Sequence, residues 1–216
     1  MNTTNRHFGA FTLVAMLLAL FITSSTMSQD FGIKVGLSSS GQSYEYDIAD
    51  FEVERLNQYG FSAGIFLSHK IGFLSEIRFE VDFVQKGSGA DILITTPQYP
   101  DGLEWFRFTD RINYVSVKVL ATPSLLSNSA IGPYFIIGPR LDILAGYTTA
   151  ISFISLDELN STVIGATIGV GIILNSKSSA PLLLEATYSP DFSNAYEKGV
   201  LTVKNNSFQL MAGFSF

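Results

Sequence analysis

The segment FLSEIRFEVDFVQKG, residues 73–87, alternates between apolar and charged side chains almost without interruption. Apolar residues such as Phe79, Val81 and Phe83 occupy odd positions, and charged residues occupy positions 76, 78, 80 and 82. Successive side chains of a β-strand point to opposite faces, so the pattern predicts a strand with one apolar face and one charged face. The fold depends on which of these two faces points inward.

The composition favours one all-β domain that contacts something other than water. The chain has 216 residues, of which 47% are hydrophobic and only 15% are charged, whereas a soluble domain usually carries about a quarter charged residues. The absence of cysteine excludes disulfides and thiolate metal sites. The formal net charge of -6 argues against nucleic acid as a partner.

Residues 1–28 have the features of a secretory signal peptide. A polar start containing Arg6 precedes an apolar run over residues 8–22, and small and polar residues follow up to Ser28, after which we expect cleavage. The run is shorter than the roughly 20 apolar residues of a membrane-spanning helix, although a retained N-terminal anchor is an alternative. No cysteine follows it, which excludes a lipoprotein anchor. The mature domain is therefore predicted to span residues 29–216.

The mature sequence contains eight segments with strand-like patterns. They cover residues 31–38, 59–68, 73–86, 111–122, 133–147, 163–174, 182–189 and 207–216. Most are long enough to cross a bilayer as tilted strands, which takes about 9–11 residues.

The connections between these segments alternate in length. The long ones are 39–58, 87–110, 148–162 and 190–206, and the other three are short turns. Long loops at one end and short turns at the other are typical of an up-and-down barrel of the bacterial outer membrane. With eight strands, both termini are expected in the periplasm and the long loops outside the cell.

Two orientations of such a barrel are consistent with the alternation. A soluble, lipocalin-like barrel holds its apolar face inside, whereas a transmembrane barrel exposes that face to lipid. The interior of eight strands is only just wide enough for side chains to fill, so the many Phe, Ile and Leu residues would overpack it. Four basic and five acidic residues, by contrast, can pair with each other inside. They are Lys34, Glu76, Arg78, Glu80, Asp82, Lys118, Arg140, Asp142 and Glu185.

We therefore predict an all-β fold: an eight-stranded antiparallel up-and-down transmembrane β-barrel whose lumen is filled by this ion-pair network. Aromatic residues on the apolar parity support the transmembrane orientation because they gather at both ends of the strands, as bilayer interfaces favour. Phe31 and Phe135 are expected at the periplasmic rim, and Tyr59, Tyr147 and Tyr188 at the outer rim.

Several segments resemble PorT-like outer-membrane β-barrel proteins of Bacteroidota-type Gram-negative bacteria. They are FGIKVGLSSS, FLSEIRFEVDFVQKGSG, INYVSVKVLATPSLL, GPYFIIGPRLDIL and NNSFQLMAGFSF. The resemblance implies that the last strand carries the signal for the barrel-assembly machinery, at Phe208, Leu210, Phe214 and Phe216. The family's namesake takes part in protein export through the type IX secretion system, so the resemblance also implies an accessory role in protein export. The family's usual INYLEIPLLLKY reads INYVSVKVLATP here, with Ser116 in place of a glutamate and Lys118 in place of an apolar residue.

We expect no enzyme activity, no catalytic residue, no cofactor and no metal site. His69 is the only histidine after residue 28, and it falls in a short turn away from the outer leaflet. Glu80 and Asp82 could act as a catalytic carboxylate pair, but a structural ion-pair network explains them more simply. The remaining alternatives are a small-solute channel, a soluble ligand-binding barrel and a barrel enzyme that acts on lipid or peptide.

Two acidic loops contain aromatic residues that could contact a partner protein. These residues are Tyr44, Tyr46, Phe51, Trp105, Phe106 and Phe108. The expected partners are outer-membrane lipid and lipopolysaccharide, the barrel-assembly machinery, and another envelope or secreted protein.

Overall fold

The computed structural model describes residues 29–46, 56–71, 76–96, 99–125, 131–149, 159–174, 180–198 and 201–216. The predicted signal peptide, residues 1–28, lies outside these ranges, as do Phe51 and Phe73. The strands are β1 (Gln29–Tyr46), β2 (Leu56–Lys70), β3 (Glu76–Thr96), β4 (Tyr99–Ala121), β5 (Ile131–Thr149), β6 (Thr162–Leu174), β7 (Leu182–Pro190), β8 (Tyr196–Lys198) and β9 (Leu201–Ser215). Within the described ranges, no helix is both long enough and apolar enough to cross a bilayer.

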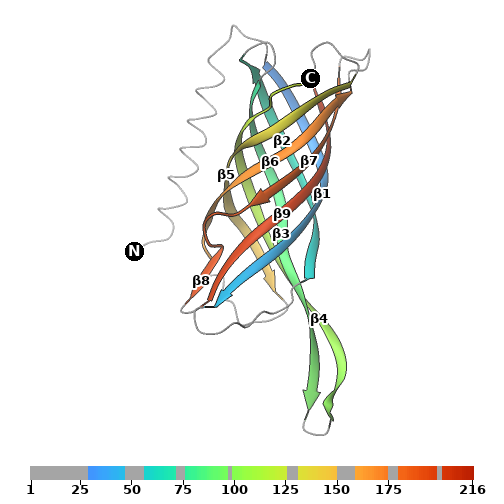
Figure 1. Ribbon diagram of the computed structural model, residues 1–216, viewed down its shortest axis with the longest axis vertical. Helices are drawn as coiled ribbons and strands as arrows, with labels where there is room; N and C mark the ends of the chain where they lie inside the picture. The colour runs from blue at the N-terminus through green and yellow to red at the C-terminus, as the bar shows by residue number, and fades with distance from the viewer. Residues whose placement is uncertain are drawn as a thin grey trace.

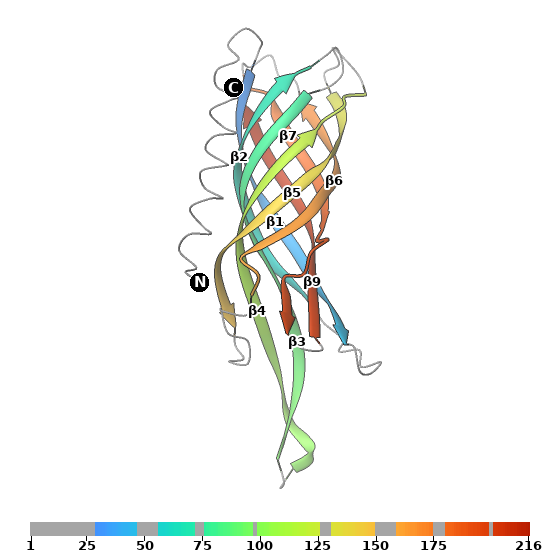
Figure 2. The same cartoon turned by 90° about the vertical axis from the view of Figure 1, so that its left-hand side faces the viewer.

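Eight of these strands form a closed antiparallel barrel (Figure 1, Figure 2). Each strand pairs with the next, and β9 pairs with both β7 and β1, so that the sheet closes on itself. The two ends of the described chain meet at the short-turn end, where the Phe216 amide donates to the Phe31 carbonyl at 2.7 Å. The eight-stranded up-and-down barrel predicted from the sequence is confirmed.

The charged face of the alternating strands points inward. Arg78 and Asp82 on β3 are 1% and 0% exposed, whereas the apolar side chains of Leu37, Ile137 and Leu210 are 70%, 55% and 54% exposed on the outside. A water-soluble barrel would bury the apolar set instead, because burial of apolar surface is the main force for folding in water. The lipocalin-like alternative is therefore wrong, and the outward apolar wall is the arrangement of a transmembrane barrel.

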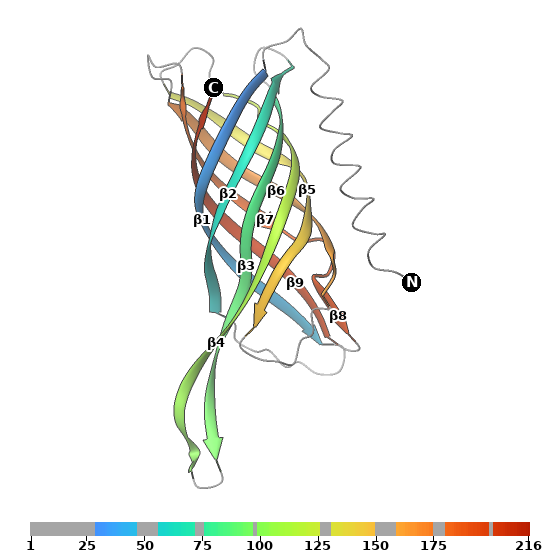
Figure 3. The same cartoon turned by 180° about the vertical axis from the view of Figure 1, so that it is seen from behind.

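The segment 87–110, predicted to be a loop, is instead a β-hairpin. β3 and β4 stay paired well beyond the barrel wall, from Gly87 opposite Arg111 to Thr96 opposite Tyr99, and the hairpin projects from the end opposite the C-terminus (Figure 3). At Gly87 the backbone φ angle is +150°, and an added Cβ would lie 1.8 Å from the Asp110 carbonyl oxygen. The chain needs glycine there because a side chain cannot fit where the wall continues into the hairpin.

Other strand ends also differ from the predicted ones. β1 continues to Tyr46, and β9 begins at Leu201 rather than residue 207, while β8 adds a short strand inside the predicted loop 190–206. Ala145 is an extra residue in β5, since Asn113 pairs with Gly146 but Tyr114 pairs with Leu144. Such a bulge reverses the side of the strand on which later residues lie. Tyr147, predicted at the outer aromatic rim, therefore packs on the buried apolar cluster around Ile112.

Apolar side chains close both ends of the lumen. Near the short-turn end, a buried cluster contains Phe66, Leu120, Tyr134, Ile136 and Leu183. Near the hairpin end, a second cluster contains Ile112, Tyr114, Val163 and Ala195. Charged side chains such as those of Lys34, Asp82 and Asp142 also fill the lumen, and these residues are at most 4% exposed.

Candidate functional site

The first charge cluster lies in the half of the lumen near the short turns. It consists of Lys34, Arg78, Glu80, Asp82, Lys118 and Glu185. Lys34 Nζ lies 2.6 Å from Glu80 Oε2 and 3.2 Å from Glu185 Oε2, and Lys118 Nζ lies 2.5 Å from Asp82 Oδ2. The Arg78 guanidinium donates to Glu185. Three basic and three acidic groups thus form one connected network that joins β1, β3, β4 and β7.

The guanidinium of Arg78 packs against two aromatic rings. Its central carbon lies 4.7 Å from the centre of the Phe66 ring and 5.4 Å from that of Tyr134. The Tyr134 hydroxyl donates to Glu185 Oε1 at 2.7 Å. A cation over an aromatic face gains additional stabilisation when it is removed from water. Through these contacts, the first charge cluster packs directly against the apolar cluster that contains Phe66 and Tyr134.

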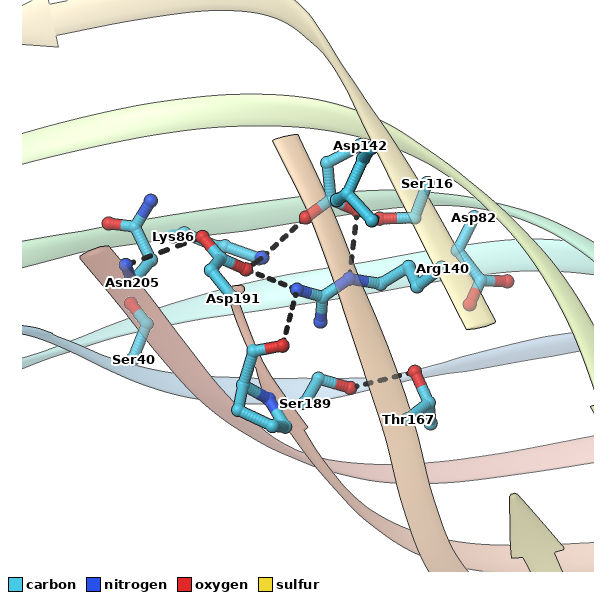
Figure 4. A network of polar contacts seen from close by, with 12 residues as sticks. Ser40, Asp82, Lys86, Ser116, Arg140, Asp142, Thr167, Ser189, Asp191 and Asn205 are labelled. Carbon is cyan, nitrogen blue, oxygen red and sulfur yellow. Dashed lines mark hydrogen bonds and ion pairs between the residues drawn. The ribbon is translucent and has the colours of Figure 1, made fainter. Parts of the chain in front are cut away.

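The second charge cluster lies nearer the hairpin and consists of Lys86, Arg140, Asp142 and Asp191 (Figure 4). Lys86 Nζ lies 2.6 Å from Asp142 Oδ2 and 3.2 Å from Asp191 Oδ1. Arg140 contacts the same two carboxylates, with Nε 3.2 Å from Asp142 Oδ1 and Nη2 bonded to Asp191. The four residues form a ring in which every charge has two opposite neighbours.

Asp191 reaches the lumen because the barrel wall is interrupted after β7. The Asp191 amide donates to the Asn205 carbonyl at 3.0 Å, and the amides of Phe192 and Ser193 both donate to the Ile164 carbonyl. The chain then resumes as β8, which pairs with β9. Gly165 makes this possible, since an added Cβ would lie 2.4 Å from the Pro190 carbonyl oxygen and 2.6 Å from Arg140 Nη2.

The structure brings eight of the nine predicted lumen residues into these two clusters. Glu76 is the exception: it is half-buried at the start of β3, and its carbonyl accepts from the Thr122 amide at 2.9 Å. Sequence reasoning missed Lys86 and Asp191. With these two included, the lumen clusters contain five basic and five acidic side chains, each at most 4% exposed.

This charge balance matters because the clusters lie in a medium that solvates charge poorly. Moving a charge out of water costs several kcal/mol even after the protein relaxes, and only close opposite charges and hydrogen bonds compensate. Ser116 and Gln209 contribute further, as the Ser116 hydroxyl donates to Asp142 and Lys118 Nζ donates to Gln209 Oε1 at 3.4 Å. The lumen is therefore neutral as a whole as well as within each cluster.

The lumen has little room for a passing solute. Near the hairpin end, the cavity beside Ile112, Tyr147 and Tyr196 has a volume of about 10 Å³, which is space for roughly one water molecule. The larger hollows, of about 570 and 550 Å³, are lined by outward-facing residues of β5, β6, β7 and β9 such as Phe135, Val170 and Ala186. Both of these larger hollows thus lie on the outer wall.

The predicted partner contacts fall on strands rather than on loops. Tyr44 and Tyr46 pair with Val203 and Leu201 at the end of β1, whereas Phe51 lies outside the described residues. The other three are on β4 within the hairpin, at positions 105, 106 and 108. The side chains of Trp105 and Phe106 are 67% and 46% exposed.

An exposed ion pair links the two strands of the hairpin. Arg107 donates from Nε and Nη2 to the two carboxylate oxygens of Asp91, at 2.8 and 2.9 Å. This hydrogen bonding holds the pKa of the Asp91 carboxyl below its ordinary value. The pair is bidentate, which fixes the geometry of the two side chains.

The predicted assembly signal lies on the outer face of the last strand. Phe208, Leu210 and Phe214 are 44%, 54% and 46% exposed, and Phe216 at the chain end is 64% exposed. The side chains of all four residues are therefore accessible on the outer surface of the barrel.

No catalytic arrangement is visible within the described ranges. His69 lies on β2 opposite Gln29 and Ile77, at the short-turn end, and not in a turn as predicted. No group of three His, Cys, Asp or Glu residues in the described part of the chain is placed to hold a metal ion. Glu80 and Asp82 are fully buried and bonded to Lys34 and Lys118.

Comparison with solved structures identifies the fold. Outer membrane protein OprG from Pseudomonas aeruginosa matches with a TM-score of 0.51 at 14% identity, over 88% of this chain and 97% of that one. A major outer membrane protein from Thermus thermophilus matches with a TM-score of 0.47 at 12% identity, over 88% and 100% of the two chains. The attachment invasion locus protein Ail of Yersinia pestis gives 0.41 at 14% identity, over 88% and 100%. No family model and no curated protein matches the sequence. The closed eight-stranded topology and the match to OprG together give the chain the fold of an eight-stranded outer-membrane β-barrel.

Proposed function

We propose that this protein is a non-enzymatic outer-membrane β-barrel with a closed lumen, which serves as a rigid anchor for an interaction at the cell surface. The barrel spans the outer membrane, with Gln29 and Phe216 on the periplasmic side and the β3–β4 hairpin outside the cell. The outer wall contacts acyl chains and lipopolysaccharide. The barrel-assembly machinery recognises β9 through its outward Phe208, Leu210, Phe214 and Phe216.

One observation carries this proposal: the lumen holds five basic and five acidic side chains that are almost fully buried and mutually paired. A conducting pore needs water along its axis, and a narrow eight-stranded interior is instead filled by side chains. Apolar clusters at both ends add a second barrier. The filled lumen thus favours an anchor over the small-solute channel.

The likeness to the PorT-like family gives the interaction role a second form, an accessory part in protein export. A barrel that does not conduct can still serve an export machine by binding a component at either face of the membrane. The projecting hairpin is the element of this chain best placed for such contact on the outer side (Figure 1).

Planar-bilayer recording tests the closed lumen. The mature protein, refolded in detergent and shown to be folded by faster gel migration before boiling, is added to a bilayer at 150 mV. We expect no stepwise conductance from the wild type. The Lys118→Ala and Asp82→Ala double variant, which removes a mutually paired positive and negative side chain from the axis, serves as a control for detection. Stable unit steps from the wild type would establish the channel alternative and contradict the proposal.

A further inference from the structure

The β3–β4 hairpin has two strand edges without partners in the described part of the chain. β3 pairs with β2 only up to Gly89, and β4 pairs with β5 only from Asp110 onward. Beyond these points the two strands pair only with each other, along residues 90–96 and 99–109 (Figure 1, Figure 3). Each edge therefore presents backbone N–H and C=O groups, which form a template for an additional strand.

Away from the hairpin tip, these edges lack the usual protection against strand addition. Natural edge strands carry lysine, proline or bulges that prevent pairing with another chain. The free part of β3 reads ADILITT and that of β4 reads YPDGLEWFRFT, with no lysine. The one proline, Pro100, and the one register irregularity, between Ile94 and Thr96, both lie at the tip, so residues 101–109 carry neither. The register places Ile92 opposite Phe106 and Leu93 opposite Trp105. The sequence of these two edges is thus compatible with the addition of a strand from a partner protein.

The hairpin extends far enough to meet a partner in the aqueous phase. Trp105 lies five residues beyond Asp110, which corresponds to about 17 Å along an extended strand at about 3.4 Å per residue. The exposed Trp105 and Phe106 are therefore outside the lipid-facing wall. Large exposed aromatic side chains are typical anchors of protein interfaces.

The net charge of the mature chain is concentrated at this end of the barrel. Outside the lumen clusters, the segments 39–58, 87–110, 148–162 and 190–206 contain 12 acidic and 4 basic residues. The three short turns at the other end, 69–72, 123–132 and 175–181, contain two lysines and no acidic residue. Asp101 and Glu104 belong to the distal part of the hairpin itself. A partner at this end therefore meets a negative field, which attracts basic segments and repels acidic ones.

We propose that the free edges of the β3–β4 hairpin bind an extended segment of a partner protein that is rich in lysine or arginine, by addition of a strand. This inference rests on the proposed surface-interaction role and names the chemistry of the partner. Main-chain hydrogen bonds to the edge supply affinity, and the acidic surroundings select for basic side chains. A second copy of this chain would bring two acidic ends together, and the phosphates of lipopolysaccharide are likewise repelled, so both fit less well.

The single tryptophan of the chain makes the test direct, because Trp105 is the only Trp in the sequence and lies on the hairpin. The mature protein in nanodiscs of zwitterionic phosphatidylcholine is titrated with the peptide KVKVTVKV, in which lysine alternates with β-formers. We expect saturable binding with a blue shift of Trp105 emission. Raising the salt concentration from 50 to 300 mM should weaken binding at least tenfold, because counterions screen the charge attraction.

Two matched peptides and one variant separate strand addition from plain charge attraction. The glutamate counterpart EVEVTVEV, and a peptide of the same length and charge with proline at alternate positions, should bind at least tenfold more weakly. A variant with Asn-Gly in place of residues 92–106 should lose the binding of labelled KVKVTVKV, followed by fluorescence anisotropy. Its faster gel migration before boiling should persist, because the barrel wall is intact.

Equal binding of the proline-containing peptide, or unchanged binding by the hairpin-deleted variant, would overturn the inference. Binding of lipopolysaccharide micelles at this site, with displacement of the peptide, would overturn the choice of a protein partner. The proposed closed lumen is tested by conductance alone, so these failures would leave that proposal in place.

Discussion

Two ion pairs with nearly the same N···O distance have opposite roles in this molecule. Lys86 and Asp142 are 2.6 Å apart in the lumen, with side chains 1% and 0% exposed. Arg107 and Asp91 are 2.8 Å apart on the hairpin, with side chains 65% and 38% exposed. The comparison shows that environment, and not bond length, decides what an ion pair contributes.

In the lumen, removal of one partner leaves the other charge buried without compensation, which costs far more than the bond itself is worth. On the hairpin, water replaces any lost contact, and exposed pairs contribute little to stability. The lumen pairs therefore hold the barrel closed, whereas the hairpin pair sets local geometry on a surface that stays available for binding. The following predictions sharpen this contrast.

The largest effect is expected for Lys86→Met, which leaves Asp142 and Asp191 facing Arg140 alone. We expect the free energy of unfolding to fall by about 3–5 kcal/mol, measured by urea titration in phospholipid vesicles with gel mobility as the readout. Lys70→Met is the matched control, since Lys70 lies 3.6 Å from Asp30 with its side chain 54% exposed. Equal effects of the two substitutions would contradict the contrast.

Restoring the charge balance should recover part of this loss. In the double variant Lys86→Met with Asp142→Leu, one positive and one negative charge are removed, and Arg140 remains paired with Asp191. We expect this variant to unfold at a higher urea concentration than Lys86→Met alone, because no uncompensated charge remains. Strictly additive losses from the two single variants would show that charge balance is not what stabilises the lumen.

The next largest effect concerns side-chain packing near the short-turn end of the lumen. At Gly171, an added Cβ would lie 2.3 Å from a carbon of the Tyr134 ring, whereas at Gly132 the nearest atoms are 3.9 Å away. Gly171→Ala should therefore reduce stability by about 1–3 kcal/mol through overpacking. Gly132→Ala is the control and should have a much smaller effect. The urea midpoints of the two variants provide the comparison.

The smallest effect on stability is expected on the hairpin. Arg107→Met removes both the N–H donors and the charge that keep the pKa of Asp91 below its ordinary value, so the pKa of Asp91 should rise when it is measured by carboxyl NMR titration. A lowered pKa in the folded state favours folding above the ordinary pKa, and this contribution is lost as pH falls. Because both groups are exposed, the urea midpoint at neutral pH should not change detectably. An unchanged Asp91 pKa would contradict the assigned hydrogen bonds.

Which side chains of a wall strand face the lumen is predictable from sequence wherever the period of two holds, and the prediction fails beyond the bulge at Ala145, as at Tyr147. Glu80, Asp82 and Lys118 share one parity with Arg78, and volume arguments alone place that parity inside a narrow barrel. Pairing partners are not predictable, since they depend on the stagger of strands around the barrel. Lys34 meets Glu185, for example, across 151 positions of sequence.

The missed residues lie where local signals point to loops. Gly87 and Gly89 suggest that the third strand ends at residue 86, which makes Lys86 a strand end and the hairpin a loop. Asp191 follows Pro190 and falls in a predicted loop for the same reason. At Lys86, pairing with β4 overrides the local preference for a turn. Asp191 does lie outside the strands, but a bridge to Gly165 and a hydrogen bond to the Asn205 carbonyl hold it against the barrel wall. The charge imbalance of the predicted set, four basic against five acidic, comes from Glu76, because the two missed residues carry opposite charges.

Spin labels along β9 give the most direct test of the inside-out barrel. The chain has no cysteine, so single Cys substitutions at positions 207, 208, 209 and 210 can each be labelled uniquely in lipid vesicles. Our account predicts high oxygen accessibility at positions 208 and 210, which face acyl chains, and low accessibility to oxygen and to a water-soluble nickel reagent at 207 and 209. Protected labels at 208 and 210 together with water-accessible labels at 207 and 209 would contradict it.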